Sequence, residues 1–462
     1  MLSRVRSFIA PVYLFACLLI GGSAQGVWQN MILQLAGVVI LAWAALDQGE
    51  EPLARPAMQL LLLAAVAILV IALQLVPLPP AVWTHLGPRQ QIARGLASLG
   101  VPLAAEPLSV DPASGVACLL AVIPALALFS AMVRLRAYRP LWLAIALITG
   151  TVAGIALGVL QVASGNPLTS PFYLYPESNW GRAVGFFANA DHMATLLVIS
   201  VPFLAAIVAA GGRAGTQARA AVIVIGAAVA IVLVVGLALN GSLAGYGLGL
   251  AVLAASLLIL LPANSRLRLS IIGLAALLVV LSFVALETSS IGSGKIGAHA
   301  NSAVESRTEI LATTSRAVED FMPFGSGFGS FQRVYPLYEK AGEVTPEYVV
   351  HAHNDYAEVA LELGLAGILL MLLFLAWWAV AVWRAWRTAQ ASPFARAAAI
   401  ASAAVLVHSF VDFPLRTAAI SACFGMCLAL LAGGRAAAQA ERQELRQVRH
   451  VVIEADAGEP PR

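Results

Sequence analysis

Residues 220–239 read AAVIVIGAAVAIVLVVGLAL, an unbroken apolar run without a charged residue. About 20 such residues are long enough to cross the hydrocarbon core of a bilayer as one helix. Backbone groups in lipid must form their hydrogen bonds internally, and the run is far too long for a strand of a transmembrane barrel. The stretch therefore predicts a membrane-spanning helix.

The rest of the chain has the same apolar character. Of its 462 residues, 60% are hydrophobic and 11% are charged, whereas about 25% of residues are charged in a soluble domain. The bilayer must be the solvent for most of this surface, so we expect an all-α, polytopic membrane bundle. The expected spans are 5–22, 27–46, 57–76, 114–133, 140–161, 188–210, 219–239, 242–262, 267–286, 356–383, 396–412 and 415–432.

The first run follows two arginines and ends in small residues, as a cleaved signal peptide would. Further spans come directly after it, which favours an uncleaved first span. The four cysteines lie in apolar runs without the spacing of metal ligands, and we read them as small apolar residues. No metal and no cofactor is expected.

Arginines gather in alternate connections between the runs. The connection 134–139 contains three, whereas the short connection 240–241 contains none. Lys and Arg are enriched in cytoplasmic loops, so both termini are predicted to be cytoplasmic. We divide the chain into three parts, namely five N-terminal spans (1–161), a membrane core (162–432) with a large outer loop (287–353), and a charged cytoplasmic tail (433–462).

Ionisable residues in or just before the expected spans fall at one end only. They open the sixth and tenth spans from outside and close the eleventh toward the outside, while the inner halves carry almost no charge. Ionisable groups near membrane depth are costly and are functional candidates, so we expect one shared cavity in the outer leaflet. The residues are Arg182, Asp191, His192, Asp355, Glu358, Glu362, His408, Asp412 and Arg416.

The tenth span carries three of these acids. Asp355, Glu358 and Glu362 share one helical face, and Glu362 would lie about 10 Å deeper than Asp355. Simpler structural roles stay open. Asp355 and Asp191 are expected as helix caps in that reading, and Glu362 as the ion-pair partner of an arginine. His408 would be a core histidine and His351 a loop histidine.

Sequence around the start of the tenth span resembles the O-antigen ligase and polymerase family. HAHNDY at 351–356 and ELGLAG at 362–367 resemble the family pattern of a His-Asn pair, a later Glu and a Gly-x-x-Gly step. Arg307 and PFGSG at 323–327 resemble its large outer loop. Weaker similarity is found in two further stretches, GRAVGFFAN at 181–189 and HSFVDFPLR at 408–416.

One departure from the family pattern stands at the outer end of a central span. The family usually shows Ser-Arg there, whereas this chain reads Ser242-Leu243. An arginine expected to bind an anion is therefore replaced by an apolar residue.

The resemblance implies a helical bundle of the GT-C type that handles undecaprenyl-diphosphate-linked glycans at the periplasmic face of a bacterial inner membrane. Family ligases transfer the glycan to lipid A core, polymerases extend a lipid-linked chain, and a third branch modifies pilin-like proteins. The expected partners are thus the lipid-linked donor, a glycan, lipid A core or protein acceptor, and membrane lipid, with no nucleic acid.

The same resemblance distributes roles among the polar residues. Guanidinium groups bind phosphate with two parallel hydrogen bonds, so Arg182, Arg307 and Arg416 are expected on the diphosphate. His353 is the first candidate for activating the acceptor hydroxyl, because histidine titrates near neutrality. Asp355 and Glu362 are the further catalytic candidates. Supporting roles are expected for His351, Asn354, Glu358, His408 and Asp412.

The expected enzyme is a metal-independent glycosyltransferase. A transporter of lipid-linked sugar or polysaccharide is the alternative. Transporters favour a midplane site and internal repeats, and the sequence shows neither. Polymerase and ligase are not separated by the sequence, because no acceptor-binding module is recognisable.

Overall fold

The computed structural model describes residues 6–24, 26–47, 52–211, 216–262, 266–288, 295–340, 348–388 and 391–433. Within these ranges the chain is almost entirely helical, and its one sheet is a two-residue antiparallel ladder between β1 (Pro77–Leu78) and β2 (Glu106–Pro107). The apolar helices are α2 (Ile9–Ile20), α3 (Trp28–Leu46), α4 (Arg55–Gln74), α7 (Pro112–Ala121), α8 (Ile123–Val133), α9 (Pro140–Ala163), α10 (Ala190–Gly211), α11 (Thr216–Asn240), α12 (Leu243–Leu260), α13 (Leu267–Thr288), α16 (Asp355–Arg387), α17 (Pro393–His408) and α18 (Ala418–Ala432).

These helices occupy the twelve ranges expected to span the membrane. Within the described residues, eight helices are long and apolar enough to cross a bilayer, with α7 and α8 counted as one, and four apolar helices are shorter. The all-α, multi-pass membrane fold is thus confirmed. The charged tail beyond Gly433 lies outside the described residues.

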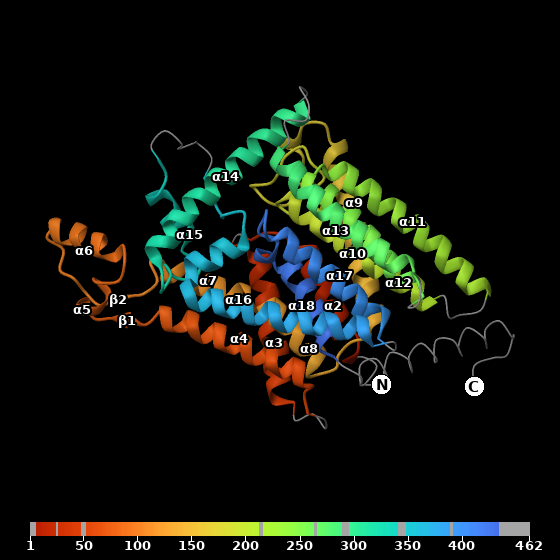
Figure 1. Ribbon diagram of the computed structural model, residues 1–462, viewed down its shortest axis with the longest axis horizontal. Helices are drawn as coiled ribbons and strands as arrows, with labels where there is room; N and C mark the ends of the chain where they lie inside the picture. The colour runs from red at the N-terminus through yellow and green to blue at the C-terminus, as the bar shows by residue number, and fades with distance from the viewer. Residues whose placement is uncertain are drawn as a thin grey trace.

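The centre of the bundle is built on helices that are buried on every side. α10 packs against α9, α11, α12 and α17, and α18 packs against α2, α8 and α17. Apart from Asp191 and His192 at the start of α10, both sequences consist mainly of apolar or small residues around the whole circumference, as expected for a helix enclosed by other helices. Figure 1 shows α16 crossing the front of this core beside α4.

The remaining elements gather at one end of the bundle. Figure 1 shows β1, β2, α5 (Pro80–Trp83) and α6 (Arg89–Ser98) projecting at the left, below α14 (Lys295–Phe321) and α15 (Phe331–Val334). Much of the outer loop 287–353 is thus helical, because α14 accounts for 27 of its residues. Short 3-10 turns complete the connections: η1 (Pro167–Thr169), η2 (Tyr335–Leu337) and η3 (Pro414–Arg416).

Two expected spans are interrupted. The run 114–133 is split into α7 and α8 before Pro124, whose ring cannot continue the hydrogen bonding of the preceding turn. α16 has non-helical backbone at Gly364, with φ 59° and ψ −142°, and so consists of a short first piece and a long second piece. This break lies immediately after Glu362, inside the block that carries the family-like motif.

Candidate functional site

The three acids predicted to share a face of α16 meet one guanidinium. An Arg416 terminal nitrogen lies 2.8 Å from Glu358 Oε1 and 3.5 Å from Glu362 Oε2, and its Nε lies 3.8 Å from Asp355 Oδ1. The side chains of Glu358 and Glu362 are fully buried. The structure thus supplies the partner that a buried Glu362 requires.

Arg416 is enclosed by negative charge. Burial alone would lower its pKa, but Glu358 and Glu362 raise it above the ordinary value, so the guanidinium stays charged. Its Nε and one terminal nitrogen already face carboxylates, and a second anion would meet those carboxylates as well. These surroundings favour an orienting role for Arg416 over the diphosphate contact expected from the sequence.

His351 is connected to the same acidic cluster. Its Nδ1 lies 2.9 Å from Glu358 Oε1, and the other Glu358 oxygen accepts from the backbone N–H of Ala352 at 3.1 Å. Because a carboxylate can only accept, Nδ1 carries the proton of this hydrogen bond. Glu358 therefore shares its charge between His351 and Arg416.

His353 pairs with a different carboxylate. Its Nδ1 donates to Asp412 Oδ1 at 3.2 Å, and its side chain is 26% exposed while that of Asp412 is fully buried. With the proton on Nδ1, the neutral ring leaves Nε2 free to accept one. His353 also has a positive φ of 49°, an uncommon backbone conformation for a residue with a side chain. It precedes the helix, and Asn354 is the N-cap, accepting from Ala357 N–H.

Asp412 is surrounded by imidazoles rather than arginines. His192 Nε2 lies 3.7 Å from its second oxygen, which is too far for a hydrogen bond. Burial alone would raise the pKa of the Asp412 carboxyl, but the hydrogen bond from His353 and the nearby His192 hold it well below its ordinary value. The carboxylate is therefore ionised, and His353 is its hydrogen-bonded partner.

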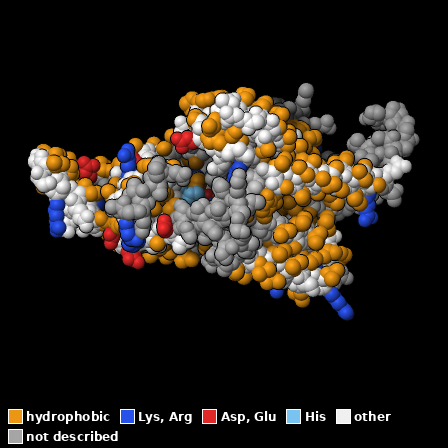
Figure 2. All heavy atoms as spheres, turned by 90° about the horizontal axis from the view of Figure 1, so that it is seen from above, with side chains coloured by type: hydrophobic (Ala, Val, Ile, Leu, Met, Phe, Trp, Pro, Cys, Tyr) orange, Lys and Arg blue, Asp and Glu red, His pale blue; other side chains and the backbone are white. Residues whose placement is uncertain are grey.

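Phe413 holds three histidines in place. Its ring centroid lies 5.0 Å from that of His192, 4.2 Å from that of His351 and 5.0 Å from that of His353. Sequence reasoning did not single out Phe413, because a phenylalanine beside a membrane span is ordinarily a packing residue. In Figure 2 histidine atoms are visible near the middle of the face, between the charged side chains at the left and the apolar surface at the right.

Arg307 lies in a second polar cluster, at the start of α10. It donates to Asp191 Oδ2 at 3.1 Å, and Ser242 Oγ donates to Asp191 Oδ1 at 2.5 Å. Asp191 therefore anchors an arginine instead of capping its own helix. Its neighbour His192 faces Asp412, so the two clusters are joined through adjacent residues of α10.

Arg182, another predicted anion contact, differs from Arg307. Arg182 is exposed, and within the described part of the chain its side chain has no ion-pair partner. The structure does not bring it to the acidic cluster. Leu243 begins α12 directly after Ser242, and Ser242 bonds Asp191. An arginine at position 243, as in the family pattern, would therefore have its backbone next to this bonded serine.

His408 is held inside the bundle. Its Nδ1 lies 2.6 Å from Thr195 Oγ1, and that hydroxyl also bonds the carbonyl of Asp191 at 2.9 Å. The ring is 2% exposed. This placement agrees with the alternative of a core histidine. Asp355, by contrast, accepts from Ser409 Oγ at 2.8 Å and is not the cap of α16.

The loop 323–329 supports the acids from the side. Its backbone N–H groups at Ser326 and Gly327 donate to the carbonyls of Leu361 and Glu362, at 2.9 and 3.0 Å. These are carbonyls that the break at Gly364 leaves without a helical partner. A Cβ at Gly364 would lie 2.3 Å from the Pro323 carbonyl oxygen, so the contact admits only glycine.

Residues of the N-terminal third secure this loop. Gln74 Nε2 donates to the carbonyls of Phe324 and Glu362, at 3.2 and 2.9 Å, and its Oε1 accepts from Phe328 N–H. Arg89, which is 3% exposed, donates to the Gly325 carbonyl at 2.9 Å. Nothing in the sequence pointed to either residue, because a polar side chain at the end of a span or in an outer segment is common.

The described residues contain no group of three or more His, Cys, Asp or Glu side chains arranged to hold a metal ion. Asp355, Glu358 and Glu362 face Arg416, while His351 and His353 each pair with one carboxylate. What the arrangement offers is paired charges, a histidine with a free ring nitrogen and a second arginine one cluster away.

The fold and this cluster define a multi-pass membrane protein with a polar site at one end of its helices. Residues 199–372 match the family model described as O-antigen ligase. The resemblance to the O-antigen ligase family is thereby confirmed over this segment, which contains Arg307, the loop 323–329 and the first piece of α16. Arg182 and the stretch 408–416 lie outside the match. No curated protein matches the chain.

Proposed function

We propose that the protein is a glycosyltransferase that acts on an undecaprenyl-diphosphate-linked oligosaccharide at the periplasmic face of a bacterial inner membrane. The match to the O-antigen ligase model supports a membrane glycan-processing role of the ligase or polymerase type. The donor, the face and the acceptor are our own extension of that finding. A glycan, lipid A core or a protein is the proposed acceptor.

The observation that carries the proposal is the pair His353–Asp412. A partly exposed imidazole donates from Nδ1 to a buried carboxylate, which fixes the tautomer and leaves Nε2 as the proton acceptor. Nε2 would take the proton of the acceptor hydroxyl. That oxygen then bonds the anomeric carbon of the donor sugar, and the bond from this carbon to the diphosphate oxygen breaks.

Negative charge develops on the diphosphate as it leaves. A preorganised guanidinium stabilises such charge in the transition state. Arg307 is the proposed contact, because it pairs with Asp191, the neighbour of His192, and is not enclosed by three acids as Arg416 is. Arg182 is proposed as a second contact on the exposed loop before α10. Asp355 and Glu362 are proposed to support catalysis by orienting Arg416 against the first piece of α16.

The function is tested by removing the protein from its cells and separating surface glycans by size. We expect long chains to disappear while lipid-linked precursor accumulates. Retained single repeat units on lipid A identify a polymerase, and loss of all lipid A-linked chains identifies a ligase. An unchanged glycan profile, or precursor trapped on the cytoplasmic side as for a lost transporter, would contradict the proposal.

Arg307→Ala and Arg307→Lys test the diphosphate contact. Each is expected to weaken transfer from a purified lipid-linked donor by about 10-fold or more, since a hydrogen bond to a charged group contributes about 1.5–3 kcal/mol. Lys retains the charge but loses the two-pronged geometry. Initial rates at several donor concentrations are the measurement.

Arg333 provides the matched control. It lies in the same outer segment, its side chain is 72% exposed, and it pairs with Asp111 instead of Asp191. Arg333→Ala should leave transfer unchanged. Equal activity of Arg307→Ala and the wild type, at equal protein level, would remove Arg307 from the donor site.

A further inference from the structure

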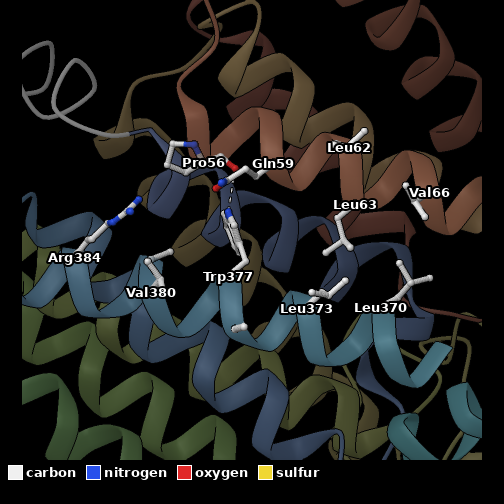
Figure 3. A pocket seen from close by; sticks show the side chains of 12 residues that line it. Pro56, Gln59, Leu62, Leu63, Val66, Leu370, Leu373, Trp377, Val380 and Arg384 are labelled. Carbon is white, nitrogen blue, oxygen red and sulfur yellow. Dashed lines mark hydrogen bonds between the residues drawn. The ribbon is translucent and has the colours of Figure 1, made fainter. Parts of the chain in front are cut away.

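A long apolar groove lies between α4 and α16, away from the histidines. Its volume is about 560 Å³. Figure 3 shows the two helices running antiparallel, with Pro56, Gln59 and Arg384 at one end and Val66 and Leu370 at the other. Side chains of Leu62, Leu63, Leu373 and Val380 form the walls between these ends.

The groove has the length of one leaflet. Pro56 and Val66 are ten residues apart in α4, which is about 15 Å at a rise of 1.5 Å per residue. The hydrocarbon core of a bilayer is about 30 Å thick. A hydrocarbon chain of one leaflet therefore fits the groove from end to end, and the polar end falls at the level of the lipid headgroups.

The polar end carries a positive charge that no described residue neutralises. Arg384 is the only charged residue that lines the groove, and within the described part of the chain its guanidinium has no carboxylate partner. The amide of Gln59 is exposed and likewise has no hydrogen-bond partner among the described residues. The Trp377 indole closes the floor by donating to the Pro56 carbonyl at 3.0 Å (Figure 3).

We propose that this groove binds one anionic phospholipid of the membrane, with an acyl chain between α4 and α16 and the phosphate at Arg384 and Gln59. Basic pockets between helices at a membrane surface bind anionic headgroups in this way. The positive charge of Arg384 favours an anionic lipid over a neutral one, and the apolar walls favour a lipid over a soluble anion. The inference does not rest on the proposed transferase activity.

Native mass spectrometry of the purified full chain tests the site, with phosphatidylglycerol and phosphatidylethanolamine of identical acyl chains as probes. We expect the wild type to retain one phosphatidylglycerol in preference to phosphatidylethanolamine. Arg384→Gln should lower this retention about five-fold, because one Arg near an anionic membrane surface contributes about 1 kcal/mol. Leu373→Trp, at a surface position that is 60% exposed, should fill the groove and displace both lipids.

Arg387→Gln is the matched control. Arg387 lies less than one turn further along α16 and stacks on Trp383, with its guanidinium carbon 4.9 Å from the ring centroid, outside the groove. It should retain phosphatidylglycerol as the wild type does. Equal retention of the two lipids by the wild type, or equal losses in Arg384→Gln and Arg387→Gln, would overturn the proposal. The proposal would also be overturned if the wild type were a dimer and Leu373→Trp were a monomer, because a second copy would then occupy the groove.

Discussion

His353→Gln is expected to bind the lipid-linked donor normally and to transfer glycan at least about 100-fold more slowly than the wild type, since general-base catalysis contributes about 10²–10⁴-fold. Glutamine can keep a hydrogen bond to Asp412 but cannot take up a proton at neutral pH. The measurement is single-turnover transfer from a purified donor, with donor binding measured separately. His353→Ala should be as slow.

His351 is the control within the same segment. It also donates from Nδ1 to a carboxylate, but that carboxylate is shared with Arg416, whereas no arginine of the described ranges pairs with Asp412. Asp412 is therefore better placed to stabilise a charged imidazole. His351→Ala should stay active. If His351→Ala were inactive and His353→Gln were active, His351 would be the general base.

Asp412→Asn should slow turnover by about 10²–10⁴-fold, the range that general-base catalysis contributes. An Asn amide can donate to Nδ1 of His353 and so place the ring proton on Nε2, where it blocks proton uptake. Because Asn has the same shape as Asp, the buried position should stay filled. We expect the donor KM to change little while kcat falls.

Ser409→Ala is the comparison on the same connection. Ser409 lies one residue beyond the end of α17. Its hydroxyl donates to Asp355, whereas the side chain of His353 bonds Asp412. Its loss should have a modest effect on kcat. If Asp412→Asn raises the donor KM and spares kcat, Asp412 serves donor binding rather than the orientation of His353.

The membrane fold was predictable because each span carries its own signal. An apolar run of about 20 residues determines a helix in lipid without reference to the rest of the chain. The break in α16 was not predictable in the same way. Glycine is tolerated inside many helices, and only the approach of Pro323 shows that Gly364 must leave helical geometry.

The site was predictable as a set of residues and not as a set of pairs. Helical spacing alone places Asp355, Glu358 and Glu362 on one face, and the structure confirms that they converge. Which acid meets which base depends on helices far apart in sequence. The pairing of His353 with Asp412, and of Arg307 with Asp191, therefore needed the fold.

The supporting contacts were the least predictable part. Gln74 and Arg89 act on backbone carbonyls of a loop about 235 to 250 residues later in the chain, at Phe324 and Gly325. A hydrogen bond to a carbonyl leaves no sequence signature at the acceptor, because every residue has that group. Phe413 was not predicted for a related reason, since packing against an imidazole requires only an aromatic ring and leaves no distinctive motif.

The distribution of the site along the chain determines when it can first exist during synthesis. Gln74 is inserted early, the loop 323–329 and the first piece of α16 follow much later, and Asp412 and Arg416 arrive only after α17 has been inserted. A chain halted before that point lacks both the carboxylate for His353 and the counter-charge for Glu358 and Glu362. A partly inserted protein would therefore lack the His353–Asp412 pair on which the proposed transfer depends.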